Sequence, residues 1–152
     1  MDESRQELRG VGEIMSGMSK YLARTRGRLL SLKKAIKGYN DIIDSMERIC
    51  HSSSGANCVG THCTNTSDPT YQIVAKIETL REKRDDMILE YNALSEELID
   101  LFDTLPHPLR VTMILHYVSG YSWERVAEKY EISPRGIYRR RDEAIKRLSG
   151  RS

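Results

Sequence analysis

Four arginines lie within seven residues near the end of the chain: Arg135, Arg139, Arg140 and Arg141. A guanidinium group is always charged, and its planar fork of N–H donors matches a phosphate or the edge of a guanine base. The helix dipole disfavours a cation in the N-terminal half of a helix by roughly 0.3 kcal/mol or more, so helix stability does not account for these residues. Their chemistry favours contact with DNA, and a basic face that is merely solvated is the alternative.

The arginines belong to a helix that the sequence predicts from Ser133 to about Leu148. Ser133 can cap this helix, and Pro134 suits the first turn, where no amide hydrogen bond is lost. At about 100° per residue, one side of the helix is apolar. That side comprises Ile137, Ala144, Ile145 and Leu148, whereas Arg135, Arg139 and Lys146 point the opposite way and Gly136 and Arg140 lie on a flank. Glycine costs roughly 1 kcal/mol inside a helix. The presence of Gly136 is explained if a partner's backbone approaches closely there.

Two shorter helices are predicted just before this one. The first has an apolar face of Val111, Ile114, Leu115 and Val118 and stops at the glycine cap Gly120. The second is capped by Ser122 and groups Trp123, Val126, Ala127 and Tyr130 on one face. Residues 131–133 alone separate it from the basic helix, and Ile132 can fill the angle between the two. This pattern predicts a helix-turn-helix.

Residues 105–148, "LPHPLRVTMILHYVSGYSWERVAEKYEISPRGIYRRRDEAIKRL", resemble region four of bacterial sigma factors. The shared landmarks are a Leu-Pro start, an apolar helix ending in Tyr-x-x-Gly, a Ser-x-x-x-Val-Ala helix, and Ile-Ser before a basic helix ending in Ala-Ile-x-x-Leu. The resemblance covers a little under a third of the chain. No other sigma region has a counterpart here, so a complete sigma factor is not expected.

A helical arm with a sigma-like tail is also similar to phage transcriptional regulators of the ArpU and RinA type. This resemblance implies binding to promoter-proximal double-stranded DNA and recruitment of host RNA polymerase, in the cytoplasm at the bacterial nucleoid. It places Arg135, Gly136, Tyr138, Arg139 and Arg140 in the groove, to which we add Ser133, Arg141 and Lys146 as DNA-binding candidates. Two positions depart from the family pattern. Glu131 replaces a usual glycine and implies a strained turn, and Arg141 lies on the apolar side, so the helix is rotated or Arg141 extends to a phosphate.

Two other functions remain open. A phage DNA-packaging protein, similar to a small terminase subunit, also joins a helix-turn-helix to a coiled-coil arm. A protein-binding adaptor could use the basic head against an acidic partner. Catalysis is not expected, because the chain has no phosphate loop or paired-carboxylate motif and because His107 and His116 lie beside or within a short apolar helix. No cofactor is implied.

The first two thirds of the chain predict two long amphipathic helices. The apolar positions of each recur in steps of three and four, which is a heptad seam. One seam runs from Leu22 to Met46 with Thr25 as its polar interruption, and the other runs from Ile73 to Leu101 with Arg84 as its interruption. The second helix is expected to end before Pro106, because a proline disfavours helical structure in the residue that precedes it. We therefore expect an all-α chain, with a frayed N-terminus at 1–17, a helical hairpin at 18–104 and the DNA-binding head at 105–152.

Charge favours antiparallel pairing of the two long helices. The first has seven bases between Lys20 and Lys37 and no acid from residue 14 to residue 40, and the second is rich in acids. The near-neutral net charge of +2 therefore conceals basic ends around an acidic middle. Heptad seams do not distinguish a hairpin within one chain from a homodimer through the helical arm, so both pairings remain open.

The segment between the long helices, residues 50–69, is predicted to be a flexible loop because Ser, Gly, Asn and Thr dominate it. Cys50, Cys58, His62 and Cys63 supply enough ligands for a zinc knuckle, but their spacing matches no standard zinc motif. We favour a linker with reduced thiols. The chain has no apolar run of about eighteen residues, so we expect no membrane span. We expect a cytoplasmic location.

Overall fold

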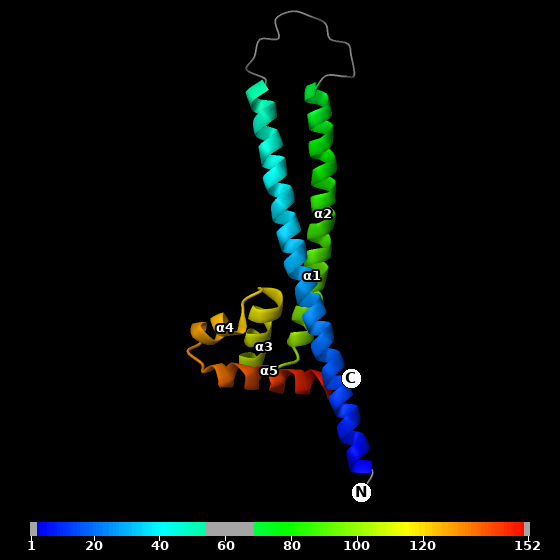
Figure 1. Cartoon of the computed structure of the whole chain (residues 1–152), viewed down its shortest axis with the longest axis vertical. Helices are drawn as coiled ribbons and strands as arrows, with labels where there is room; N and C mark the ends of the chain where they lie inside the picture. Colours follow the sequence, from blue (N-terminus) through cyan, green and yellow to red (C-terminus); the bar gives the residue numbers. More distant parts are fainter. Residues whose placement is uncertain (1–2, 54–68, 151–152) are drawn as a thin grey trace, which may run out of the picture. The chain divides into compact units, whose positions relative to one another are not determined.

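The computed structural model describes residues 3–53 and 69–150, and within these ranges the chain is helical with short turns and no strand. The predicted all-α fold is therefore confirmed, with two long helices that pack as a hairpin and a small helical head (Figure 1). No helix in the described residues is long and apolar enough to cross a membrane. The elements are α1 (Glu3–Ser53), α2 (Pro69–Phe102), α3 (His107–Met113), the π-helical segment η1 (Ile114–Val118), α4 (Trp123–Lys129) and α5 (Pro134–Ser149).

The long helices differ from their predicted limits at three ends. α1 begins at Glu3, so it includes residues 3–17, where a frayed segment was expected. Extending an existing helix needs no new nucleation, which offsets the roughly 1 kcal/mol cost of each glycine there. α1 also runs to Ser53, past the expected loop start at residue 50. α2 begins at Pro69 as predicted and ends at Phe102, four residues before Pro106.

The chain divides into two compact units, and one of them is residues 31–91. In this unit α1 and α2 run antiparallel, because Asn40 pairs with Arg84 and Glu47 with Arg81 as the numbering rises on one helix and falls on the other. Arg84, the polar interruption of the second seam, donates to Asn40 Oδ1 at 3.3 Å. The Arg81–Glu47 ion pair has the opposite polarity to the one expected, with the base on α2 and the acid on α1.

The other unit joins residues 1–30 to residues 92–152. Leu22, Leu29, Leu98 and Phe102 are buried in it, and the Tyr21 hydroxyl donates to Glu97 at 2.6 Å. The base of the hairpin thus packs with the head, and the division does not fall at the expected boundary between residues 104 and 105. The reason is size, because fewer than fifty residues of short helices bury too little apolar surface to fold without added core.

The first helix of the head is buried on a different face from the predicted one. Val111, Ile114, Leu115 and Val118 are half-buried, whereas the buried residues are Leu109, Thr112, Met113, His116 and Tyr117. α5 covers this helix on one side, and α2 reaches it through Phe102, whose ring lies 6.0 Å from that of Tyr117. A helix covered on several sides has no wide solvated face, so periodicity alone did not identify its most buried positions.

Candidate nucleic-acid interface

Serine caps begin both helices of the predicted helix-turn-helix. The Ser122 hydroxyl accepts a hydrogen bond from the Arg125 amide at 3.3 Å, and the Ser133 hydroxyl accepts one from the Gly136 amide at 3.1 Å. A cap of this kind is worth about 1 kcal/mol because it satisfies an amide that has no partner within the helix. Both predicted caps are confirmed, and they fix where α4 and α5 start.

The turn between α4 and α5 depends on one strained residue and one apolar one. Glu131 has φ +52°, in the left-handed region that favours glycine, so the strain predicted at this position is confirmed. Ile132 packs against the buried cluster of Val126, Ala127 and Ile137. Its amide donates to the Ala127 carbonyl at 2.9 Å. The turn thereby sets the angle at which α5 leaves α4.

Contacts within the protein explain why residue 136 is a glycine. A Cβ at this position would come within 2.6 Å of Ile132 Cγ2 and 3.2 Å of Ser133 Oγ. A contact of 2.6 Å is too short for two carbon atoms, so any larger residue would push on the turn. The close approach that we attributed to a partner's backbone is therefore already made by Ile132.

The two faces of α5 are separated as predicted. Ile137, Ala144, Ile145 and Leu148 are all at most 5% exposed. The opposite face presents the exposed residues Arg135, Arg139 and Lys146. Arg135 and Arg139 are four residues apart, which is about one helical turn, so their guanidinium groups form a basic strip on the N-terminal half of α5. Tyr138 beside them is 37% exposed.

Arg141 is half-buried and has partners on its own helix. Its Nε donates to Asp142 Oδ1 at 3.0 Å, and its guanidinium carbon lies 5.0 Å from the centre of the Tyr138 ring. These contacts hold the side chain along the helix surface, which is how a long cation on an apolar flank reaches solvent. Arg141 is thus held by partners that Arg135 and Arg139 lack among the described residues.

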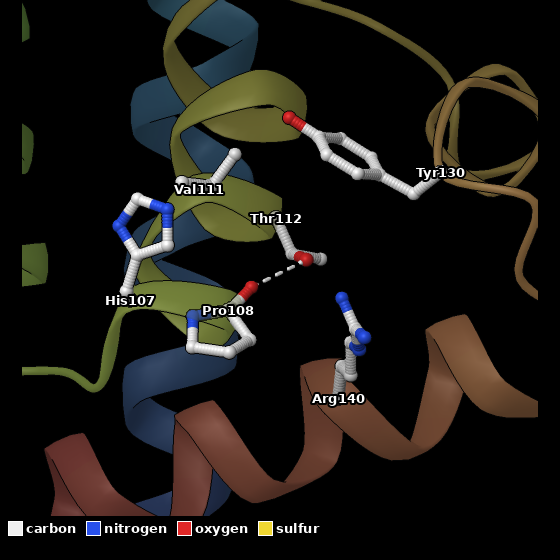
Figure 2. A pocket seen from close by; sticks show the side chains of 6 residues that line it. All are labelled: His107, Pro108, Val111, Thr112, Tyr130 and Arg140. Atoms are coloured by element: carbon white, nitrogen blue, oxygen red, sulfur yellow. Dashed lines mark hydrogen bonds between the residues drawn. The ribbon is translucent and has the colours of Figure 1, made fainter.

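The Arg140 side chain points from α5 toward Thr112 of α3 (Figure 2). It lines a pocket of about 220 Å³ together with His107, Pro108, Val111, Thr112 and Tyr130. The Thr112 hydroxyl in this pocket donates to the Pro108 carbonyl at 2.8 Å. Within the part of the chain that the structure describes, Arg140 has no ion-pair partner, so its guanidinium can receive an external anion at the rim of the pocket.

Aromatic rings connect α5 to the core of the head. The His116 ring stacks on Trp123 with centroids 3.8 Å apart, and Trp123 lies 6.4 Å from Tyr138. Burial and the nearby Arg26 charge lower the pKa of His116 from 6.5 to about 4. His116 Nδ1 lies 2.7 Å from the Tyr121 carbonyl, and since a carbonyl only accepts, the neutral imidazole carries its proton on Nδ1. His116 is therefore a buried core residue whose Nδ1 has a hydrogen-bond partner.

Arg26 of α1 is the residue that sequence reasoning missed. We counted it among the bases of the first helix, but its Nε donates to the His116 carbonyl at 3.0 Å and its Nη2 to the Gly120 carbonyl at 3.3 Å. Gly120 has φ +82°, and a Cβ there would come within 2.8 Å of Leu30 Cδ2. The signal was the glycine cap itself, because the last carbonyls of a helix need donors from elsewhere.

The zinc hypothesis finds no support in the residues that the structure describes. Cys50 lies half-buried on α1, and the other proposed ligands, Cys58, His62 and Cys63, lie outside the described residues. No group of three or more His, Cys, Asp or Glu side chains within the described ranges could hold a metal ion.

No protein-family model, curated protein or solved structure matches this chain. Statements about function therefore rest on the fold, on the basic strip of α5 and on the sequence motifs of residues 105–148.

Proposed function

We propose that this chain is a sequence-specific DNA-binding transcription regulator of a bacterium or a bacteriophage. The observation that supports the proposal most is the pair of exposed guanidinium groups, Arg135 and Arg139, on the face of α5 opposite its buried side. α5 has 16 residues and is about 24 Å long, and an α-helix with its side chains is about 10–12 Å across, which suits a major groove about 12 Å wide.

The side chains of α5 divide into two roles in this proposal. Arg135 and Arg139 fork onto base edges, because they lie on the outward strip near the helix start. Lys146 attracts phosphates from the C-terminal half of the helix, and Arg140 receives a backbone phosphate at the rim of its pocket. Ser133 and Gly136 act indirectly, since both hold the turn that aims α5.

We further propose that the chain acts at promoters. The resemblance of residues 105–148 to region four of sigma factors supports promoter-proximal binding, recruitment of RNA polymerase and a place at the bacterial nucleoid. The competing functions are a DNA-packaging protein and a protein-binding adaptor. The number of subunits on DNA distinguishes a packaging protein, and the absence of DNA binding distinguishes an adaptor.

The test is selection of bound fragments from bacterial and phage DNA by the full chain, followed by fluorescence anisotropy at several salt concentrations. Arg139→Ala should cost about 1–3 kcal/mol on the selected site and relax the base preference, whereas Lys146→Ala should weaken all DNA equally and reduce the salt slope by about 1. Arg147→Ala is the matched control, because Arg147 is on the same helix but pairs with Glu143 at 3.0 Å.

The proposal fails if no DNA shows salt-dependent binding. A ring of eight or more subunits on the selected DNA would instead favour packaging. Capture of a protein by a chain that retains no DNA would favour the adaptor.

A further inference from the structure

α1 carries a second heptad seam within the unit of residues 31–91. Its members are uncharged and recur in steps of four and three: Ser31, Ala35, Gly38, Ile42, Ser45, Ile49 and Ser52. This is the spacing by which one helix packs along another. The two large members are Ile42, which is 50% exposed, and Ile49, which is 52% exposed. An apolar seam of this kind is available to a further helix.

The unit of residues 31–91 also has a small core of its own. Among its described residues, the buried apolar side chains are Leu32, Ile43 and Ile77. A pair of helices buries one stripe of each, and units of this size usually gain stability from oligomerisation or another added constraint. Covering Ile42 and Ile49 would add to that core.

Two serines of the seam, Ser45 and Ser52, are suited to burial. The Ser45 hydroxyl donates to the Asp41 carbonyl at 2.9 Å, and the Ser52 hydroxyl donates to the Ile49 carbonyl at 3.0 Å. Because each hydroxyl already has a partner on its own helix, covering it leaves no donor unsatisfied. From Ile42 to Ser52 the seam therefore alternates large apolar side chains with small ones that can pack against them.

We propose that this face of α1 binds the same face of a second copy of the chain, with the two α1 helices antiparallel. A two-fold axis near residue 47 places Ile42 over the partner's Ser52 and Ile49 over the partner's Ser45. The symmetry repeats each contact, so the interface has four layers in which a large side chain meets a small one. This matches volumes across the contact, as close packing requires.

The charges beside the seam identify the partner and its register. Asp41 and Arg48 border the seam, are exposed, and have no ion-pair partner among the described residues. Antiparallel helices bring equivalent flanking positions together, as Glu47 and Arg81 show within the hairpin. In the proposed register each Asp41 lies beside the partner's Arg48, so two ion pairs form.

The neighbouring registers are opposed by the same charges. A shift of one heptad in one direction places Asp41 beside the partner's Asp41 and Lys34 beside the partner's Arg48. A shift in the other direction places Arg48 beside the partner's Arg48. Like charges in contact select against both alternatives. The face is thus complementary to itself in one register.

Sedimentation equilibrium of the full chain tests the dimer. Asp41→Arg and Arg48→Asp each place like charges at both symmetric pairs, so each should raise the dimer dissociation constant about tenfold or more. The double variant D41R/R48D exchanges the charges and should restore the constant to within about threefold of the wild-type value. Asp86→Arg, an exposed acid on α2 away from this seam, is the matched control.

Circular dichroism must show equal helicity for these variants. They lie in a different compact unit from α5, so they test the dimer independently of DNA binding. Three results would overturn the proposal: a wild-type chain that stays monomeric up to about 100 µM, single variants that dimerise as well as the wild type, or a double variant weaker than either single one. Ile42→Glu must also abolish the dimer.

Discussion

Arg26 on α1 donates a hydrogen bond to the backbone carbonyl of His116, a residue 90 positions later in the chain. The same guanidinium donates to the Gly120 carbonyl, so one side chain satisfies two carbonyls at the end of η1. Side-chain contacts over such a sequence distance couple the base of the hairpin to the head. They explain why residues 1–30 belong to the same compact unit as residues 92–152.

Replacing Arg26 should therefore destabilise the head and its supporting helices together. Arg26→Ala leaves two partly buried carbonyls without donors, which should lower the free energy of unfolding by about 1–3 kcal/mol. Arg26→Lys should recover only part of the loss, since an ammonium group lacks the fork that reaches both oxygens. Urea unfolding followed by circular dichroism measures both. Arg24→Ala, an exposed neighbour on the same helix, is the control, and an equal loss there would contradict this role for Arg26.

His116 should make stability depend on pH below neutrality. The pKa of His116 is about 4 in the folded chain, whereas the ordinary value of 6.5 applies to the unfolded chain. As the pH falls, the unfolded chain therefore takes up a proton on this ring before the folded chain does. The contribution of the neutral imidazole is fully present above pH 6.5 and is lost as the pH falls from 6.5 through 4. Urea midpoints between pH 4 and pH 7 should fall more steeply for the wild type than for His116→Gln. Identical slopes, or a midpoint that rises as the pH falls, would show that His116 is not buried as a neutral ring.

Glu131 should be replaceable by glycine with a gain in stability. Its φ of +52° costs a residue with a side chain roughly 1 kcal/mol, and glycine adopts this conformation without strain. Glu131→Gly should raise the free energy of unfolding by about 0.5–1 kcal/mol in thermal or urea denaturation. Glu128→Gly, inside α4, supplies the contrast, because there glycine should cost about 1 kcal/mol. A destabilised Glu131→Gly variant would mean that the carboxylate has a compensating contact.

The sequence predicted local features of the head well because they depend on nearby residues. Ser122, Ser133 and the apolar side of α5 follow from cap chemistry and from a period of 3.6 residues, and all three were confirmed. The first helix of the head was the exception. It is covered on several sides by elements distant in sequence, so its most buried face could not be deduced from its own pattern.

Contacts between distant residues account for the other differences. Arg26 was counted only among the bases of its helix, but it donates to the His116 carbonyl. The Arg81–Glu47 ion pair likewise depends on three-dimensional register and has the opposite polarity to the one that the helix charges favour. Arg140 was placed with the groove-facing residues by resemblance, whereas its side chain points into a pocket beside α3. The geometry of a single helix predicts on which face a residue lies, whereas tertiary packing decides which residue it contacts.

Gly136 distinguishes these two kinds of information experimentally. Gly136→Ala should destabilise the head by about 1–3 kcal/mol, because the added methyl group meets Ile132 Cγ2 at 2.6 Å. Ile132→Ala also costs stability by removing apolar packing, but the double variant I132A/G136A should lose less than the sum of the two single losses, since the clash is gone. Urea unfolding of the four proteins gives the coupling. Strict additivity, with Gly136→Ala impaired only in DNA affinity, would return Gly136 to the role of a contact point for a partner's backbone.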